Sequence, residues 1–310
     1  MEFVSVIICT YNKTSRLLLT LTSYEKLYRN FYSNFEIIVC NDGGEDISLI
    51  VNPNNYSYPI RCYNLPHLGR AAARNYGVKN ACGSIIMFND DDILINPNCF
   101  LFHTQIHNNI SNAVVVGKYR QIYLNENEIE SKNIDEFNFY KYLNVSKNDM
   151  HEMYTKDKIF ESKKWSRHWI CGATGNMSLK NEVFKQSEGM DTHFQGWGYE
   201  DIEFSYRLFH MNLLFYCNIE HPNCHIDHAR DKSTMISDIK RNILYFYNKH
   251  KQATDISLYW DFLRGSRTLK DFDSKTIKEL NMSEQTDCIY PGLLRTKLED
   301  LESLSQNKSK

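Results

Sequence analysis

The chain of 310 residues contains no apolar run that approaches the roughly 20 residues of a transmembrane helix. Its formal net charge is only −2, which gives no sign of a surface for nucleic acid or for an anionic membrane. The nine cysteines are odd in number and form no C-x-x-C pair, so we expect buried reduced thiols and not a disulfide framework. The first strand-like run starts at Phe3 and leaves no room for a signal peptide. These absences predict a cytoplasmic protein with no nucleic-acid partner, whose only membrane contact would be peripheral, at the inner face.

The usual nucleotide-binding signatures are missing as well, because no G-x-G-x-x-G follows the first strand and no P-loop is present. What is present is a series of short, mostly β-branched runs, which predict buried strands at residues 4–9, 35–40, 60–63 and 84–88. Helical spacing follows the first run from Thr14, and a helix opens after the third run near Gly69. This alternation predicts βαβ units, and therefore an α/β fold whose mainly parallel central sheet is flanked by helices.

Three consecutive carboxylates follow the fourth of these strands. Asp90, Asp91 and Asp92 stand where a buried strand ends, which is the edge of an open α/β sheet where ligands bind. Adjacent carboxylates repel one another, and a hard divalent cation such as Mg²⁺ or Mn²⁺ relieves that repulsion by binding their oxygens. The alternative is an acidic surface loop, since Asp is common in turns.

Four segments of the first half resemble, in their order and spacing, the motifs of the family 2 glycosyltransferases, which are inverting enzymes of the GT-A fold. They are C-T-Y-N-K at residues 9–13, similar to the family's P-T-Y-N-R with Cys in place of Pro; N-D-G at 41–43; L-G-R-A-A-A-R-N-Y-G at 68–77, similar to G-x-x-x-A-R-N-x-G; and D-D-D at 90–92, similar to the D-x-D metal motif. The resemblance implies a GT-A fold and a UDP-sugar donor.

The resemblance also implies which residues bind the nucleotide. Asp42 would accept a hydrogen bond from the uracil imide, and Arg74 would offer its fork of donors to the pyrophosphate or the base. Without the resemblance, Asp42 is a turn former before Gly43 and Arg74 is a solvated helix residue. The other implied nucleotide contacts are Thr10, Tyr11 and Asn12 around the uracil and ribose, with Asp90 and Asp91 of the acidic triplet. The implied metal ligands of the triplet are Asp90 and Asp92.

A second motif, G-W-G-Y-E-D at residues 196–201, precedes apolar residues at helical spacing. Glu200 and Asp201 are therefore expected in the first turn of a helix, whose positive end stabilises an ionised carboxylate. The segment resembles the W-G-x-E-D motif of β4-galactosyltransferases, chondroitin polymerases and polypeptide N-acetylgalactosaminyltransferases. That resemblance implies Asp201 as the catalytic base, Glu200 as a contact to the acceptor or donor sugar, and Trp197 as a platform against a sugar face. The alternative is that acidic residues simply favour helix starts.

Two further segments carry weaker resemblances. Residues 170–178 resemble the family's G-G-N-M-S segment, which implies that Gly175 and Asn176 lie beside the donor sugar and the acceptor; an ordinary glycine turn is the alternative. Related families also place a histidine after the next strand, where it completes the metal site. Here His225 comes first after that strand and His228 is the second choice, and imidazole with carboxylates suits Mn²⁺. A structural histidine is the alternative.

The sequence thus predicts a catalytic domain at residues 1–230, with a nucleotide-binding half (1–115) and an acceptor half (116–230), and a helical C-terminal extension at 231–310. The polar stretch 125–158 is expected to be a surface insertion or a loop over the site. The predicted function is a metal-dependent inverting glycosyltransferase, with Mn²⁺ or Mg²⁺, that moves a sugar from a UDP-sugar to a hydroxyl of a glycan acceptor, as in the synthesis of a bacterial surface polysaccharide. A protein or peptide acceptor is the first alternative. A sugar-nucleotide pyrophosphorylase and a non-catalytic nucleotide- or glycan-binding module are the others.

Overall fold

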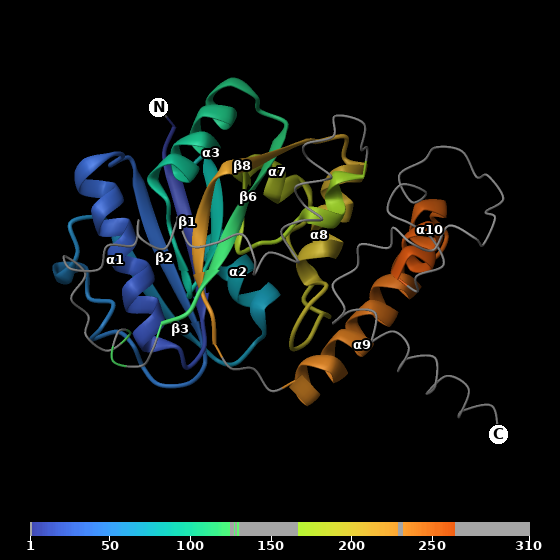
Figure 1. Ribbon diagram of the computed structural model, residues 1–310, viewed down its shortest axis with the longest axis horizontal. Coiled ribbons are helices and arrows are strands. Elements are labelled where there is room, and N and C mark those ends of the chain that lie inside the picture. The colour runs from blue at the N-terminus through green and yellow to red at the C-terminus, as the bar shows by residue number, and fades with distance from the viewer. Residues whose placement is uncertain (1, 125–126, 128, 130–166, 229–231, 264–310) are drawn as a thin grey trace.

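The computed structural model describes residues 2–124, 127, 129, 167–228 and 232–263, and Figure 1 shows how their helices and strands are arranged. The strands are β1 (Val4–Thr10), β2 (Phe35–Asp42), β3 (Ile60–Leu65), β4 (Ile85–Asp90), β5 (Ile93–Leu94), β6 (Ala113–Ile122), β7 (Asn176–Lys180) and β8 (Leu214–Ile226). The α-helices are α1 (Thr14–Asn30), α2 (Arg70–Lys79), α3 (Pro97–Asn109), α7 (Asn181–Gln186), α8 (Glu200–His210), α9 (Lys232–His250) and α10 (Thr254–Leu263), and the short 3₁₀ helices are η1 (Pro53–Asn55) and η3 (His168–Cys171). The four strands predicted from β-branched runs are all present.

These strands form one sheet, with the order β3-β2-β1-β4-β7-β6-β8-β5. The pairings of β1 with β2 and β4, of β2 with β3, and of β6 with β8 are parallel. β7 is antiparallel to β4 and β6, and β5 is antiparallel to β8. The predicted α/β fold with a mainly parallel sheet is therefore confirmed. Because β1, β2 and β4 run in the same direction, their carboxyl ends place residues 10–13, 42 and 90–92 at one edge of the sheet.

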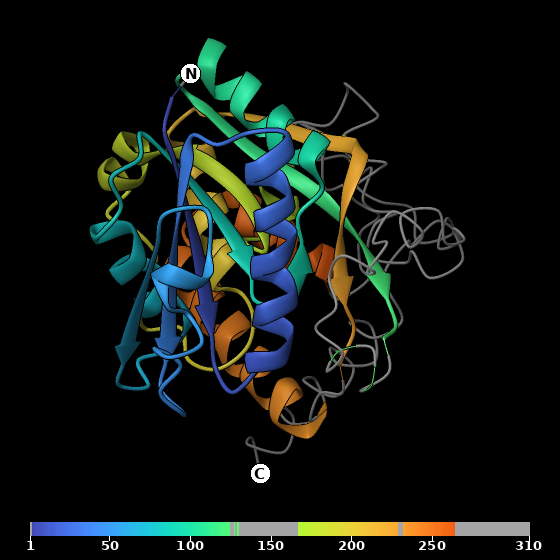
Figure 2. The ribbon, with the colours of Figure 1, turned by 90° about the vertical axis from the view of Figure 1, so that its left-hand side faces the viewer.

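Helices cover both faces of the sheet. On one face, Leu17 and Leu21 of α1 and Phe100 of α3 pack on β1 and β2, and Figure 2 shows α1 running across this face. On the other face, Phe184 of α7 and Phe204 of α8 join α2 in a second apolar cluster. The central strands are buried on both faces, which is why their sequences are continuous apolar runs with little polar alternation.

The helices α9 and α10 lie beyond α8, on the side away from the sheet (Figure 1). Their anchor is Trp169 of η3, which is fully buried and contacts Tyr206 of α8, Phe246 of α9 and Tyr259 of α10. A helix beginning near Ser233 is thus confirmed, whereas most of the polar stretch 125–158 and everything after 263 lie outside the described residues. Within the described part of the chain, no helix has both the length and the apolar character that crossing a bilayer requires.

Two buried histidines of α3 flank the side chain of one serine on β7. His103 Nδ1 and His107 Nε2, both on α3, lie 2.7 and 2.8 Å from the hydroxyl oxygen of Ser178 on β7. Burial lowers the pKa of His103 to about 3 and that of His107 to about 4, and for His103 the second imidazole adds to the effect. Both imidazoles are therefore neutral in the folded protein at pH 7.

This pair predicts that stability falls as the pH drops from 7 towards 4. The pKa of each histidine is lower in the folded than in the unfolded state, so the unfolded chain binds more protons once the pH passes below about 6.5, the unperturbed value. Urea unfolding at pH 7, 6 and 5 should show a smaller pH-dependent loss in His103→Gln than in the wild type, since glutamine does not titrate. His221→Gln, at a half-buried position on β8, is the matched control. Equal losses in wild type and His103→Gln would contradict the assignment.

Candidate active site

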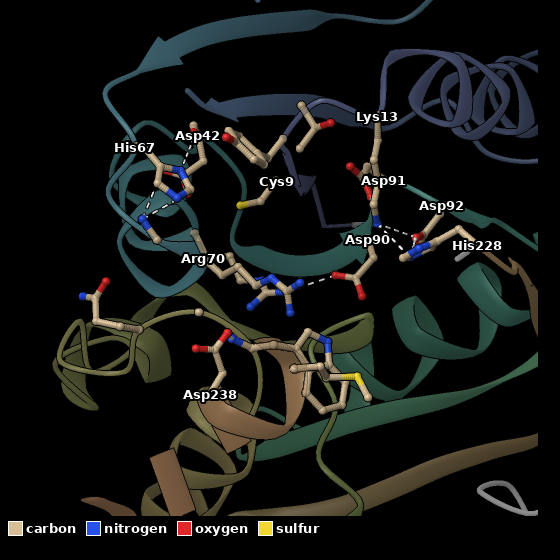
Figure 3. A pocket seen from close by; sticks show the side chains of 18 of the residues that line it. Cys9, Lys13, Asp42, His67, Arg70, Asp90, Asp91, Asp92, His228 and Asp238 are labelled. Carbon is tan, nitrogen blue, oxygen red and sulfur yellow. Dashed lines mark hydrogen bonds and ion pairs between the residues drawn. The ribbon is translucent and has the colours of Figure 1, made fainter. Parts of the chain in front are cut away.

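A pocket of about 440 Å³ opens at the carboxyl ends of β1, β2 and β4 (Figure 3). One wall is formed by residues that follow these strands and by the start of α2. The opposite wall comes from the Gly-Trp-Gly loop and from α9. The lining residues are Cys9, Thr10, Tyr11, Lys13, Asp42, His67, Gly69, Arg70, Arg74, Asp90, Asp91, Asp92, Gln195, Gly196, Trp197, His225, His228, Thr234, Met235 and Asp238.

The acidic triplet lies at one end of this pocket, and a lysine partly neutralises it. The ammonium group of Lys13 lies 2.8 Å from Asp92 Oδ2 and 3.4 Å from Asp91 Oδ1. Burial would lower the pKa of Lys13, but the two carboxylates outweigh burial and raise that pKa above its ordinary value. Lys13 therefore brings a permanent positive charge to the triplet.

The two buried carboxylates of the triplet differ in their electrostatics. Burial raises the pKa of Asp91 to about 6, although the charge of Lys13 opposes the rise. Burial would also raise the pKa of Asp92, but the hydrogen bond from His228 and the charges of His225 and Lys13 outweigh burial and lower that pKa below its usual range. Asp92 is thus the carboxylate of the pair that stays ionised under all ordinary conditions.

Asp92 and the two candidate histidines form a cluster that fits a divalent metal. Asp92 lies 3.4 Å from His225 Nε2 and 3.2 Å from His228 Nε2, and one ligand atom of each residue lies within 4.8 Å of the others. Ligands about 2.1 Å from a single ion are themselves about 3.0–3.5 Å apart. One carboxylate with two imidazoles is a donor set that Mn²⁺ and related ions accept. The structure brings both histidines to Asp92. The sequence places His225 just after the strand, but β8 extends to Ile226 and includes His225, so the preference for His225 over His228 stays a prediction.

Arg74 is the buried centre of the site. Its guanidinium donates from Nη2 to Asp90 Oδ1 at 3.0 Å and from Nη1 to Glu200 Oε1 at 3.2 Å. Burial alone would lower the pKa of Arg74, but Asp90 and Glu200 hold it above its ordinary value. This arginine joins the end of β4 to the start of α8, two segments that are far apart in the sequence.

Asp42 is also buried, and it holds the start of α2. Its carboxylate accepts hydrogen bonds from the backbone N–H groups of Leu68 and Gly69, at 2.7 and 3.0 Å. The ring of His67 in turn lies over the ring of Tyr11, with their centroids 4.7 Å apart. This end of the pocket thus presents an acidic side chain near two exposed rings, whereas the cluster of Asp92 with His225 and His228 lies at the other end (Figure 3).

The structure brings most of the predicted site residues to this pocket but not all of them. Asn12 has a left-handed backbone, and its side chain lies against Gly44. Gly175 lies beside Asp90, where an added Cβ would come within 2.8 Å of the carboxylate. Asn176 is buried and donates to the carbonyl of Lys118. The remaining predicted residues outside the lining are Glu200, which reaches the pocket through Arg74, and Asp201, whose Oδ1 accepts from the N–H of Ile202.

Sequence reasoning did not identify several residues that line the pocket. Lys13 and Arg70 belong to the quoted motifs, and their positive charges next to an acidic triplet could have identified them. His67 directly precedes the segment L-G-R-A-A-A-R-N-Y-G at residues 68–77. No signal in the sequence could have placed Thr234, Met235 and Asp238 of α9 in the site, because they lie beyond the part of the chain that carries the resemblance.

Comparison with known proteins agrees with this geometry. The model of glycosyl transferase family 2 matches residues 5–184, and the model of the N-terminal domain of galactosyltransferase matches residues 157–233. The uncharacterized glycosyltransferase YfnE of Bacillus subtilis (strain 168) is 24% identical over 294 residues, which cover 83% of this chain and 73% of that protein. Validoxylamine A glucosyltransferase of Streptomyces hygroscopicus subsp. jinggangensis (strain 5008) is 27% identical over 267 residues, which cover 83% of this chain and 63% of that protein.

Solved structures share the fold at low sequence identity. S. aureus TarS 1-349 in complex with UDP-GlcNAc has a TM-score of 0.56 and 15% identity, over 96% of this chain and 80% of that chain. GalNAc-T7 with UDP, GalNAc and Mn²⁺ has a TM-score of 0.57 and 16% identity, over 97% of this chain and 55% of that chain. The predicted GT-A fold is confirmed by these neighbours. Since the first family model covers more than half of the sequence, the chain belongs to glycosyl transferase family 2.

Proposed function

We propose that the chain is a metal-dependent inverting glycosyltransferase that moves a sugar from a UDP-sugar to a hydroxyl group of a glycan acceptor. The observation that carries the proposal is that Asp42, Arg74, the acidic triplet and Trp197 line the same pocket. These residues come from four separate motifs of the sequence. The UDP-GlcNAc bound to TarS and the UDP and Mn²⁺ bound to GalNAc-T7 support a nucleotide-sugar donor and a divalent metal.

The charges along the pocket fit the two ends of a UDP-sugar. The uracil would lie near Asp42, where the rings of Tyr11 and His67 offer flat surfaces, with Thr10 beside the ribose. The pyrophosphate would lie towards the triplet, within reach of Arg70 and Lys13. A divalent cation held by Asp92, His225 and His228 would supply positive charge that stabilises UDP as the leaving group.

The acceptor side of the proposal rests on the segment around Trp197. Trp197 would lie against a sugar face, and Gly175 would let a sugar approach beside Asp90. Asp201, at the positive end of α8, would take the proton of the attacking hydroxyl, so that an in-line displacement of an α-linked donor gives a β-linked product. We propose a growing bacterial surface glycan as the acceptor, a protein or peptide as the alternative, and a cytoplasmic location. Release of UDP from a panel of UDP-sugars, with and without each acceptor class, tests the function directly.

The metal site predicts that Mn²⁺ tightens the binding of UDP. Calorimetry should show UDP affinity rising by roughly tenfold or more with Mn²⁺, and Asp92→Ala should abolish the gain because the shared ligand is lost. His225→Ala and His228→Ala should each reduce the gain, with the larger effect at His225. His221→Ala, on the same strand but outside the pocket lining, is the control. Equal UDP affinity in EDTA and in Mn²⁺ would refute the metal site.

Lys13 predicts a competition between its ammonium group and the metal. The ammonium group lies 2.8 Å from Asp92 and 3.1 Å from His228 Nε2, so a bound ion and Lys13 cannot both use these atoms. Lys13→Met should therefore bind Mn²⁺ roughly tenfold more tightly in the absence of nucleotide, because no ion pair has to break first. The measurement is the rise in melting temperature with Mn²⁺ for both proteins. A smaller rise in Lys13→Met than in the wild type would show that Lys13 does not compete.

We expect that replacing Asp201 lowers turnover without weakening the binding of the donor. Asp201→Asn keeps the shape of the side chain and removes the proton acceptor, so transfer should fall by roughly 10²–10⁴. UDP affinity with Mn²⁺ should change little, because Asp201 does not line the pocket. Asp255→Asn, on α10, is the control for a lost carboxylate elsewhere. Near wild-type transfer by Asp201→Asn would show that another residue is the base. Weakened UDP binding would show that Asp201 has a structural role.

A further inference from the structure

The Gly-Trp-Gly loop at residues 195–198 is held almost entirely by side chains of α9. The side-chain amide of Asn242 donates to the carbonyls of Gln195 at 2.9 Å and Gly198 at 2.8 Å, with a longer contact of 3.4 Å to Trp197. Asp238, one helical turn earlier, accepts the backbone N–H of Trp197 at 3.0 Å. The loop therefore has several of its backbone polar groups paired with side chains of α9.

The glycines of the loop make this arrangement possible. Gly196 and Gly198 have φ values of +70° and +94°, a left-handed backbone that favours glycine. A Cβ at Gly196 would lie 2.1 Å from Asp238 Oδ2, so a larger residue would displace the carboxylate that accepts the N–H of Trp197. Asn242 is itself almost fully buried. This loop conformation and α9 therefore depend on each other.

The helix α9 is in turn fixed to α8 by a buried charge network. Glu203 of α8 has no exposed side-chain surface and lies 2.8 Å from Lys249, 3.0 Å from His250 and 2.9 Å from Arg207. Asp238 also pairs with Arg241, 2.8 Å away on the next turn. Removing these partners would leave the Glu203 carboxylate buried and uncompensated, which is strongly destabilising. This network therefore holds α9, which carries the side chains that contact the loop, against α8.

We propose that Asn242 and Asp238 are positioning residues, which fix Trp197 at the rim of the pocket so that the C-terminal helix α9 shapes the sugar side of the site and not its nucleotide side. The inference rests on the proposed function, since it takes Trp197 as the platform for a sugar. Thr234 and Met235 of α9 line the pocket beside Asp238, whereas Asp42 and Arg74 have no hydrogen bond to α9 among those that the described residues show.

The first test is the solvent exposure of Trp197 in Asn242→Leu, which replaces the amide with an apolar side chain of similar size. Acrylamide quenching of Trp197 emission, taken as the difference from the same protein carrying Trp197→Phe, should rise by about twofold because the loop opens locally. UDP affinity with Mn²⁺ should stay within about twofold of the wild type. Asn248→Leu, an exposed asparagine on the same helix, is the matched control and should change neither value.

A second pair of variants keeps the inference testable if Asn242→Leu folds poorly. Asp238→Asn retains an oxygen that can accept the N–H of Trp197, so acrylamide should quench its Trp197 emission as in the wild type. In Asp238→Ala the quenching of Trp197 should rise as in Asn242→Leu. Unchanged quenching in both Asn242→Leu and Asp238→Ala would overturn the inference. So would a loss of UDP affinity that accompanies the quenching, because α9 would then support the whole site. Quenching needs no substrate, so a wild-type protein that turns over no UDP-sugar would refute the proposed function alone.

Discussion

The buried guanidinium of Arg74 is the interaction on which the site depends. It joins Asp90 at the end of β4 to Glu200 at the start of α8, at 3.0 and 3.2 Å. Glu200 is as buried as Arg74, so breaking this pair would cost roughly 3–5 kcal/mol, whereas the Asp90 side chain is 41% exposed and its pair with Arg74 contributes less. The two bonds thereby fix the distance between the strand ends, where we propose that the nucleotide binds, and the helix that carries the proposed base. Arg74 also keeps its charge under all ordinary conditions.

A second constraint is the density of carboxylates at the same edge. Asp90, Asp91 and Asp92 cannot all be ionised side by side without compensation, and their compensation is unequal. Asp90 has Arg74, and Asp92 has Lys13 and the two histidines. Asp91 has only the longer contact to Lys13 among the ion pairs of the described residues, and this contact does not outweigh the burial that raises its pKa. A metal and a pyrophosphate would add charges of both signs to this balance, which is a physical reason for linking the binding of the two.

The fold could be predicted from the sequence because its signals are local. The β-branched runs of β1, β2 and β4 and the motifs directly after them specify the strands and the edge where the site lies. The side chains that reach the site from afar could not be predicted in this way. Gly175 lies beside Asp90 in the turn before β7, while Asn176, the first residue of β7, is buried and donates to the carbonyl of Lys118. Asp238 reaches the pocket only because α9 folds back onto α8, a contact that no short motif encodes.

The two acids of the Gly-Trp-Gly-Tyr-Glu-Asp segment lie in different surroundings. Successive residues of an α-helix point about 100° apart, so Glu200 and Asp201 cannot face the same partner. Glu200 is buried and already accepts a hydrogen bond from Arg74, which leaves this oxygen poorly placed to take a proton from an acceptor hydroxyl. Asp201 is only partly buried, and the loop that precedes it is held by α9. The arrangement therefore supports different roles for the two carboxylates: Glu200 would hold Arg74 in place, and Asp201 would remain the better candidate for the base.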